Sequence, residues 1–387
     1  MKKILHATSS YYPAFSFGGS VSADFETDME LSCQNIKIDI STTNAGLKDN
    51  EVLLNRWIKH KDLNIVYFPF IGYIHYNFSL KYLWFLILHI KDYDLVHFSG
   101  IWNFPVVFGP IVARFFKKPY IITPHGTLYK ETFEGKSAII KKIHYYCFVK
   151  RNIQKANIIH FTTKDEKDKV EDFLQINFNS KIVPYGMEFT NKEIVLEDYR
   201  DKYNIPKDKK LILFLGRINW KKGLDILFQG FQKILESRDD CILLCVGPDV
   251  EHYSNELKKL VQEQTLQNII FTSMVEGDDK IAMYKLADIF ILPSYSENFG
   301  MTVIEAASFK LPIVISNKVG LHNEIKENDA GLIIDTNIND IENSLNMLLT
   351  DQALCERIKN NAYKMAIDKF SRKNSAKMFK QMYKEIV

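Results

Sequence analysis

Two glutamates bracket a short, glycine-containing loop in the segment SYSENFGMTVIE, residues 294–305. Glu297 precedes the loop, and Glu305 lies in an apolar run that is typical of a helix. Loops that open helices expose backbone N–H groups, and such groups bind anions such as phosphate. Because a carboxylate repels an anion, the presence of one on each side of this loop requires an explanation.

Helix capping explains only one of the two glutamates. Thr302 and Glu305 have the spacing of a capping box, in which both side chains bond the first backbone N–H groups of a helix. Capping does not account for Glu297, nor for the open amides around Phe299 and Gly300. These residues by themselves leave both interpretations open.

A second candidate segment is LFLGRINWKKG, residues 213–223. A strand pattern ends at Gly216 and Arg217, and Lys222 stands where the next helix begins. A guanidinium and an ammonium group five residues apart, both in loops at strand ends, suit a diphosphate. The alternative is a pair of solvated surface charges. The second phosphate-binding pattern in the same half of the chain argues against that alternative.

Two further patterns lie in the first half of the chain. His125 follows a strand pattern in TPHGTL, residues 123–128. A histidine in this position is either a structural residue or part of a site. Gly18 and Gly19 either allow the backbone to approach a ligand closely or form a tight turn. They do not belong to a G-x-G-x-x-G dinucleotide fingerprint, which is absent.

These residues must be positioned by strands and helices that alternate along the chain. Helical patterns include residues 22–34, 80–91 and 137–155. Repeated βα units predict parallel sheets that are covered by helices. The pattern restarts after residues 201–210, which predicts two Rossmann-like, doubly wound domains that face each other across a cleft. Each candidate segment follows a strand, at the sheet edge where open α/β folds bind ligands.

Length and composition fit two ordinary globular domains. The 387 residues are 46% hydrophobic and 25% charged, and a net charge of +3 is too small to argue for nucleic acid. Cys241 and Cys245 lie on one face of a strand pattern, without the spacing of a metal pair. No signal-peptide pattern occurs, nor an apolar run of ~20 residues. We therefore expect a cytoplasmic protein, either soluble or attached to a membrane surface.

Together the segments resemble the retaining GT-B glycosyltransferases, specifically glycosyltransferase family 4 (glycosyl transferases group 1). The resemblance rests on the Gly-Arg and Lys-Gly pair, followed about 80 residues later by the two glutamates. The segments MKKILHATSSYYPAFSFGGS, DLVHFSGIW, ITPHGTL, NIIHFTT and KIVPYGME also occur in the order found in the family. The resemblance therefore covers nearly the whole chain.

The resemblance implies a role for each candidate residue. Glu297 would contact the donor sugar and Glu305 the ribose hydroxyls, while the amides between them meet the phosphates of a UDP- or GDP-sugar. The implied catalytic residues are His125, Arg217, Lys222 and Glu297. The implied donor-binding residues are Gly18, Gly19, Gly216, Arg217, Lys222, Glu297, Asn298, Phe299, Gly300, Met301, Thr302 and Glu305. Arg217 and Lys222 would neutralise the leaving diphosphate, so neither a metal nor another cofactor is expected.

The resemblance also implies domains and a reaction. Residues 1–190 would bind the acceptor, residues 200–370 the nucleotide sugar, and a helix over residues 371–387 would pack back on the first domain. A hexose-type sugar would pass to a glycan or lipid-linked acceptor, in bacterial surface polysaccharide or lipopolysaccharide synthesis. The retaining reaction is described as a same-face substitution, in which the leaving phosphate helps to take the acceptor proton.

Two positions depart from the family pattern. Tyr185 stands where the family often has Asn, and Ser273 stands where a Gly is common in the base-binding loop. The second departure leaves the preferred base open. Two other functions are kept as alternatives: a GT-B-fold sugar-nucleotide epimerase or hydrolase, and a catalytically inactive GT-B scaffold. Turnover that depends on an acceptor separates the transferase from both alternatives.

Basic residues are concentrated in residues 114–155, which contain 10 Lys and Arg but only two acidic residues. Part of this segment is predicted to form an amphipathic helix with Ile139, Ile140 and Ile143 on its apolar side. The apolar side either packs on the sheet, with a solvated basic face, or binds an anionic membrane surface. Nucleic acid is not expected as a partner, because no recognised binding module occurs.

Overall fold

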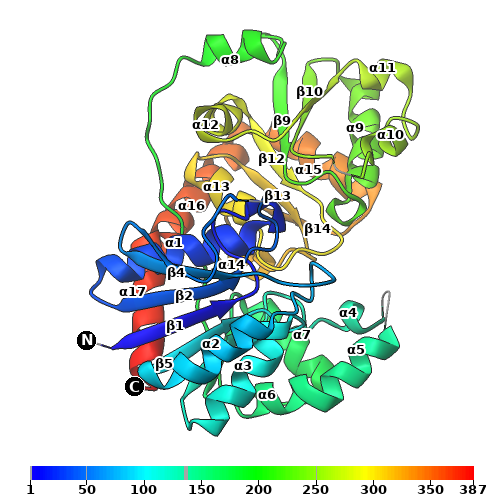
Figure 1. Ribbon diagram of the computed structural model, residues 1–387. Coiled ribbons are helices and arrows are strands. Elements are labelled where there is room, and N and C mark those ends of the chain that lie inside the picture. The colour runs from blue at the N-terminus through cyan, green and yellow to red at the C-terminus, as the bar shows by residue number, and fades with distance from the viewer. Residues whose placement is uncertain (1, 49, 135–137, 250) are drawn as a thin grey trace. The chain divides into compact units, whose positions relative to one another are not determined.

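The computed structural model describes residues 2–48, 50–134, 138–249 and 251–387 (Figure 1). The chain divides into two compact units. Unit 1 contains residues 1–187 and 371–387, and unit 2 contains residues 188–370. Each unit is built on a largely parallel sheet with α-helical connections, which confirms the predicted fold class.

The sheet of unit 1 has, among the described residues, eight strands in the order β3-β4-β2-β1-β5-β6-β7-β8. All neighbouring pairs are parallel except β3–β4. β1 and β5 are buried along almost their whole length, as expected for strands covered on both faces. The strands are β1 (Lys3–Thr8), β2 (Lys37–Thr43), β3 (Trp57–His60), β4 (Leu63–Phe68), β5 (Leu95–Ser99), β6 (Tyr120–Thr123), β7 (Ile158–Phe161) and β8 (Ser180–Ile182).

The helices of unit 1 come from both ends of the chain. α1 (Gly19–Cys33) packs against α17 (Arg372–Lys384), the red helix in Figure 1. A separate apolar core brings together side chains of α2 (Leu80–His89), α3 (Phe104–Phe115) and α7 (Lys164–Leu174). The remaining segments are η1 (Phe15–Phe17), η2 (Ile90–Asp92), α4 (Lys130–Glu134), α5 (Ala138–His144), η3 (Tyr145–Val149) and α6 (Lys150–Gln154).

The sheet of unit 2 is entirely parallel, with the strand order β11-β10-β9-β12-β13-β14 in the described chain. β10 buries both of its cysteines, Cys241 and Cys245, in agreement with the structural role predicted for them. The strands are β9 (Lys210–Leu215), β10 (Cys241–Val246), β11 (Ile269–Thr272), β12 (Ile289–Leu292), β13 (Ile313–Ser316) and β14 (Leu332–Ile334).

The helices of unit 2 pack in pairs around this sheet. α9 (Leu224–Ser237) packs on α15 (Ile338–Thr350), α13 (Met301–Ser308) on α16 (Gln352–Phe370), and α12 (Gly277–Leu286) contacts α8 (Leu196–Lys202). The remaining segments are η4 (Trp220–Lys222), α10 (Ser254–Leu257), α11 (Glu263–Leu266) and α14 (His322–Glu327).

Two predictions for unit 1 need correction. β3 was not predicted; it forms an antiparallel edge with β4, and its alternation of exposed and half-buried residues gives only a weak strand signal. The helix predicted over residues 137–155 is three segments, because the π-helical η3 separates α5 from α6. Residues 135–137 lie outside the described residues.

A chain of buried hydrogen bonds links α17 to the sheet of unit 1. His160 Nε2 lies 2.8 Å from the carbonyl oxygen of Val183, and a carbonyl can only accept. His160 Nδ1 therefore accepts from Thr123 Oγ1 at 2.8 Å. Thr123 then accepts from His97 Nε2 at 2.6 Å, which leaves His97 Nδ1 to accept from the hydroxyl of Tyr383 at 2.9 Å. Every member of the chain is neutral and has a partner.

The end of this chain generates the first prediction. Tyr383→Phe leaves His97 Nδ1 buried without a donor, and a lost buried partner costs about 1–3 kcal/mol. We expect α17 to become less protected, as measured by hydrogen exchange of peptides from residues 372–384. Tyr73→Phe removes the hydroxyl of a tyrosine that is 70% exposed, and it serves as the control. Equal protection in the two variants would contradict a stabilising hydrogen bond between Tyr383 and His97.

Candidate functional site

The strand order of unit 2 brings the two candidate segments of its sequence together. β9 and β12 are neighbours in the sheet. The strands that follow β9 in sequence, β10 and β11, lie on one side of this pair, and those that follow β12, β13 and β14, lie on the other. The loop after β9 carries Arg217 and Lys222, and the loop after β12 carries Glu297. Such a switch point leaves a crevice at the carboxyl ends of the two strands, where open α/β sheets bind ligands.

Backbone contacts fix the two loops against each other. The N–H of Tyr295 donates to the carbonyl of Lys221 at 2.8 Å. Gly223 has φ +65°, and a Cβ at this position would stand 2.1 Å from the carbonyl oxygen of Pro293. Only glycine allows both the left-handed conformation and this close approach. The loops therefore present Lys222 and Glu297 in a defined relation.

Two ion pairs lie at this edge of the sheet. Lys222 Nζ contacts Glu297 Oε2, and their side chains are 15% and 22% exposed. Lys280 Nζ on α12 lies 2.5 Å from Glu305 Oε1, while Tyr284 donates its hydroxyl to Glu305 Oε2 at 2.6 Å. Each glutamate is therefore held by a lysine, and the carboxylates flank the beginning of α13.

The structure corrects the capping interpretation of Thr302 and Glu305. α13 begins at Met301, its N-cap is Gly300 with φ +95°, and no side chain caps it. Glu305 is directed to Lys280 and Tyr284 instead of to the backbone N–H groups. Because no side chain caps α13, the first backbone N–H groups of the helix can donate hydrogen bonds to an anion.

The other predicted donor residues of unit 2 lie around this helix start. Phe299 is buried, and its ring packs edge-on against Phe370 at 6.0 Å, so its side chain anchors the loop. Asn298, Met301 and Thr302 are half-buried in the same turn. Glu297 forms a backbone bridge with Val319, which fixes the start of the loop.

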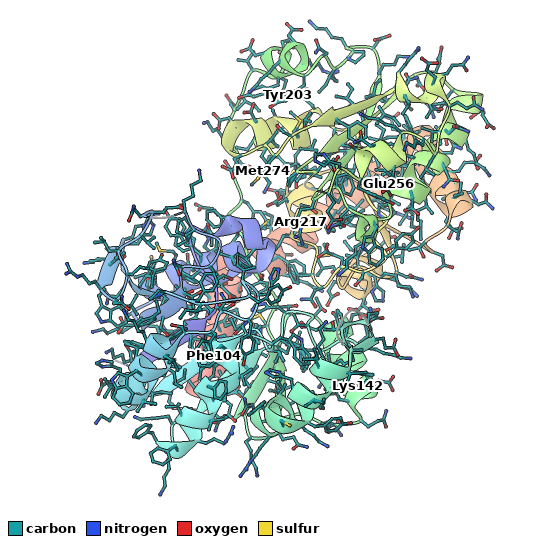
Figure 2. The ribbon with its side chains drawn as sticks, turned by 45° about the vertical axis from the view of Figure 1, so that its right-hand side comes forward. Phe104, Lys142, Tyr203, Arg217, Glu256 and Met274 are labelled. Carbon is teal, nitrogen blue, oxygen red and sulfur yellow. The ribbon has the colours of Figure 1, made fainter. Side chains whose placement is uncertain are left out.

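Gly216 and Arg217 end β9 with different degrees of exposure. Gly216 is half-buried, and a Cβ there would find only ordinary contacts, the nearest at 3.5 Å to Phe214. The side chain of Arg217 is exposed, and Figure 2 shows it within unit 2. Its guanidinium can therefore reach a ligand without breaking a buried contact.

In unit 1 the switch point lies between β1 and β5. Gly18 and Gly19 follow β1 on one side of it, and His125 follows β6, the neighbour of β5, on the other side. Gly18, with φ +106°, is the N-cap of α1, and Gly19 begins that helix. The positive φ explains why glycine is needed at position 18. His125 lies after β6 and also has a positive φ, +53°.

A buried glutamate fixes the loop of His125. Glu166 Oε1 accepts from the N–H of Gly126 at 2.6 Å, and Oε2 accepts from the N–H and hydroxyl of Thr162. The indole of Trp102 donates to the carbonyl of Thr127 at 2.9 Å. The left-handed conformation of His125 is thus imposed by its surroundings, as is frequent at functional sites.

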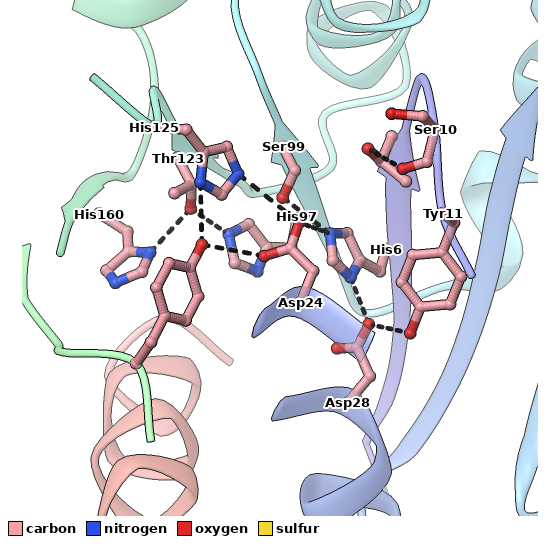
Figure 3. A network of polar contacts seen from close by, with 12 residues as sticks. His6, Ser10, Tyr11, Asp24, Asp28, His97, Ser99, Thr123, His125 and His160 are labelled. Carbon is pink, nitrogen blue, oxygen red and sulfur yellow. Dashed lines mark hydrogen bonds and ion pairs between the residues drawn. The ribbon is translucent and has the colours of Figure 1, made fainter. Parts of the chain in front are cut away.

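Sequence reasoning missed the residues that surround the His125 ring. Asp24 on α1 lies 3.5 Å from His125 Nε2 (Figure 3). The hydroxyl of Tyr185 lies 2.9 Å from His125 Nδ1. Tyr185 was noticed only as a departure from the family pattern. The sequence signal that could have drawn attention to Asp24 is its spacing of four residues from Asp28 in a predicted helix. The structure shows both aspartates buried.

Opposite charges govern the ionisation of the buried groups near His125. Burial would raise the pKa of Asp24, but the nearby His125 and His6 rings hold it well below its ordinary value. Burial would lower the pKa of His6, but Asp28 and Asp24 raise it to about 9. Burial without a carboxylate partner lowers the pKa of His160 to about 4. Charged and neutral histidines therefore lie side by side in unit 1.

In the basic segment, residues 114–155, the isoleucines that could have packed on the sheet are exposed instead. Ile139 is 75% exposed and Ile140 is 69% exposed, and α5 has no buried residue. The side chains that pack inward come from η3 instead, where Tyr145 and Val149 are buried. Lys142 on α5 is also exposed (Figure 2). In the described chain, no helix is both long and apolar enough to cross a bilayer.

Comparisons with known proteins show what the chain is similar to. Residues 196–365 match the family model described as glycosyl transferases group 1. An uncharacterized glycosyltransferase, MJ1607 of Methanocaldococcus jannaschii, is 28% identical over 306 residues, which are 77% of each chain. The alpha-monoglucosyldiacylglycerol synthase of Streptococcus pneumoniae is 25% identical over 337 residues, 84% of this chain and 74% of the synthase. The Anabaena protein Alr3699/HepE, solved with UDP-glucose, superimposes with a TM-score of 0.76 over all of both chains at 15% identity.

The buried histidines predict a pH dependence of stability. The pKa of His160 is about 4 in the folded unit, against an ordinary value of 6.5. Between pH 6.5 and 4, this histidine is therefore protonated in the unfolded chain but neutral in the folded unit. Stability from this group is complete above pH 6.5 and falls as the pH drops towards 4, by about 3 kcal/mol in total. His160→Gln should lose less stability than the wild type between pH 7.5 and 4.5, as measured by urea unfolding at each pH.

His89→Gln is the control for this measurement, because the side chain of His89 is half exposed in the same unit. It should show the pH dependence of the wild type. If His160→Gln also followed the wild type, His160 would not remain neutral in the folded unit.

Proposed function

We propose that the chain, whose residues 196–365 match glycosyl transferases group 1, is a retaining glycosyltransferase that uses a nucleotide diphosphate sugar. The hexose-type sugar would pass to a glycan or lipid-linked acceptor, in the synthesis of a bacterial surface polysaccharide or lipopolysaccharide. The observation that carries the proposal is the uncapped start of α13 between Glu297 and Glu305, each held by a lysine.

The ligand that suits this arrangement has an anionic centre and hydroxyl groups at both ends. Amides at the start of α13, together with Arg217 and Lys222, would bind the diphosphate. The carboxylates of Glu297 and Glu305 would accept hydrogen bonds from hydroxyls of the hexose and of the ribose. This answers why two carboxylates flank an anion site: a nucleotide sugar has hydroxyls on both sides of its phosphates.

Binding the donor would require the lysines to exchange partners. Lys222 contacts Glu297, and a diphosphate between them would compete with the carboxylate for the ammonium group. The exchange releases Glu297 towards the sugar. Both side chains are partly solvated, so the desolvation that resists such an exchange is smaller than for a buried pair.

In the proposed reaction, one bond at the anomeric carbon of the sugar replaces another. The acceptor oxygen forms a bond to the anomeric carbon on the face from which the diphosphate leaves, and the bond from that carbon to the phosphate oxygen breaks. The acceptor proton goes to the leaving phosphate. Arg217, Lys222 and the start of α13 would stabilise the charge that develops on the diphosphate. Because these groups supply the positive charge, we propose that no divalent metal is needed.

The base is proposed to be uridine or guanosine, and the Anabaena protein solved with UDP-glucose favours UDP as the first candidate. The two alternative functions differ in whether the donor is turned over. An epimerase or hydrolase would turn over the donor without an acceptor, and a scaffold would bind it without turnover. Initial experiments should therefore measure UDP binding and acceptor-dependent release of UDP separately.

Lys222 and Glu297 should separate binding from chemistry. Lys222→Ala removes a charge-assisted contact to the diphosphate and should weaken UDP binding about 10- to 100-fold. Glu297→Gln keeps Lys222 available, so UDP should bind at least as tightly as to the wild type, while sugar transfer falls about 100-fold or more. Calorimetry with UDP, with and without EDTA, and a transfer assay measure the two effects.

Lys221→Ala is the matched control, because Lys221 is the exposed neighbour of Lys222 and lies over the ring of Trp220. It should bind UDP like the wild type. If Glu297→Gln abolished UDP binding, the proposed division of roles between the two glutamates would be wrong. A loss of UDP binding in EDTA would contradict metal independence.

The basic segment is proposed to attach unit 1 to the inner face of the cytoplasmic membrane. Water-exposed isoleucines beside basic residues are unfavourable in a freely soluble unit and suit a lipid interface. Ile139, Ile140 and Ile143 supply the apolar contact, while Lys142 and Arg151 are exposed near them in the chain. Each such cation contributes about 1 kcal/mol near an anionic bilayer. Such a location would suit a lipid-linked acceptor.

Replacement of all three isoleucines by serine should weaken binding to anionic vesicles at least tenfold, because it removes the apolar contact. Sedimentation with vesicles of anionic or zwitterionic phospholipid measures this effect. The triple variant Leu53→Ser, Val195→Ser and Met347→Ser changes three other exposed apolar residues outside the basic segment and should bind like the wild type. Wild-type protein that ignores anionic vesicles would refute the proposal.

A further inference from the structure

We infer that Tyr284 is a positioning residue that keeps the carboxylate of Glu305 in place to accept both hydroxyls of a ribose. It thereby gives the nucleotide site its preference for a ribonucleotide over a 2′-deoxyribonucleotide. The inference rests on the proposed function, in which Glu305 binds the ribose, and it adds the residue that orients this glutamate. Tyr284 and Glu305 both lie in unit 2.

Two donors from one side of α12 reach the carboxylate of Glu305. Lys280 and Tyr284 are four residues apart in this helix, so their side chains project in the same direction. Lys280 Nζ lies 2.5 Å from Glu305 Oε1, and the hydroxyl of Tyr284 donates to Oε2 at 2.6 Å. Each carboxylate oxygen therefore has a donor of its own.

The two donors differ in how firmly they are held. The side chain of Lys280 is 35% exposed, so water can replace Glu305 as its partner when the ion pair opens. Tyr284 is 1% exposed, and its hydroxyl has no comparable access to water. When the lysine moves away, the tyrosine therefore still holds one oxygen of the carboxylate.

Packing against α13 fixes the ring of Tyr284. The ring is stacked on that of Phe309, with centroids 5.3 Å apart and planes within 8°. Phe309 is the residue that ends α13, four positions after Glu305. Tyr284 thus contacts α13 at two points one helical turn apart, through its ring and through its hydroxyl. These two contacts determine where the hydroxyl lies relative to Glu305.

The hydroxyl of Tyr284 can act only as a donor to Glu305. Burial and the neighbouring Glu305 raise the pKa of Tyr284 well above its ordinary value of 10. The hydroxyl therefore keeps its proton at physiological pH, and a carboxylate oxygen accepts it. The contact persists over the whole pH range in which binding would be measured.

The remaining acceptor positions of Glu305 match a vicinal diol. An ionised carboxylate offers about four acceptor positions, two on each oxygen. Lys280 and Tyr284 occupy one position on each oxygen. One position on each oxygen is left for a ligand, and the side chain of Glu305 is 19% exposed. The 2′- and 3′-hydroxyls of a ribose lie on adjacent carbons and can donate to both oxygens at once.

A purely structural tyrosine is the alternative interpretation. A buried hydroxyl requires a hydrogen-bond partner, whereas the ring of a phenylalanine would fill the same space without that requirement. A surface ion pair such as Lys280–Glu305 adds little stability and does not need a second donor. The buried hydroxyl is therefore better explained by the orientation that it imposes on Glu305.

A fixed carboxylate makes the missing hydroxyl of a deoxyribonucleotide costly. Without the 2′-hydroxyl, one oriented acceptor of Glu305 loses its donor, and sites built to bind a hydroxyl discriminate against analogues that lack it. Without the hydroxyl of Tyr284, the carboxylate can turn away. The ribonucleotide then loses much of its advantage, whereas the deoxyribonucleotide loses less.

The test is calorimetry of the full chain with UDP and with 2′-deoxy-UDP. The wild type should bind UDP about tenfold or more tightly than 2′-deoxy-UDP. Tyr284→Phe removes one buried oxygen and keeps the stacked ring, and its ratio should fall to about threefold or less, mainly through weaker binding of UDP. Glu305→Gln gives the ratio of a site without the carboxylate.

Two matched variants in unit 2 are the controls. Lys285→Met changes another lysine of α12, whose ammonium group donates to the carbonyl of Lys192 at 2.6 Å. Tyr363→Phe removes the hydroxyl of a tyrosine on α16 whose ring contacts Lys310. Both should keep the wild-type ratio. Thermal unfolding shows whether each variant is folded.

The ratio separates positioning from a structural role. If Tyr284 only stabilised the fold, both nucleotides would bind more weakly by the same factor, and an unchanged ratio would overturn the inference. Phe309→Leu is a second variant, which loosens the ring without removing the hydroxyl and should also lower the ratio. A wild-type ratio in this variant would contradict the role of the stacked ring.

The same measurements distinguish failure of the inference from failure of the proposed function. Tight binding of UDP with equal ratios in the wild type and Tyr284→Phe would overturn only the inference. A wild-type protein that binds neither UDP nor GDP would refute the proposed function, and the inference would fall with it.

Discussion

The pairing of charges that are withdrawn from water is the constraint on which both units depend. A parallel sheet collects loops at the carboxyl ends of its strands, and in this protein those loops and nearby helices carry lysines, aspartates, glutamates and histidines. A buried charge is stable only beside an opposite charge or a set of hydrogen bonds. The partners in each unit therefore come from segments far apart in the sequence, which fixes how those segments pack.

This constraint also explains which parts of the structure could be predicted. The strand runs of the second half and the position of Arg217, Lys222 and Glu297 after strands follow from local pattern, because apolar periodicity is a local property. The antiparallel β3 and the π turn of η3 could not be predicted, since an exposed edge and one extra residue in a helical turn leave little local signal. Thr302 and Glu305 matched a capping box by spacing, yet two side chains on α12 determine where Glu305 points.

The neighbours of His125 were hidden for a different reason. Tyr185 bonds Asp24 across 161 positions of the sequence, and nothing in either local pattern indicates the other. The sequence could suggest only that a histidine after a strand belongs to a site. The two side chains that contact its ring, Asp24 and Tyr185, are brought together only by the fold. The sequence thus identifies the atoms that can react, and tertiary packing decides which groups contact them.

The two units place their charges at different depths, and the depths match different tasks. Asp24 and His125 are 10% and 12% exposed, and Asp28 and His6 are each 3% exposed, so separating either pair would leave a buried aspartate without one of its partners. Lys280 and Glu305 are 35% and 19% exposed, and water can compensate when such a pair opens. Pairs that cannot separate suit a rigid framework that holds the surrounding loops in place. Pairs that can separate suit a surface where a charged ligand has to replace one of the partners.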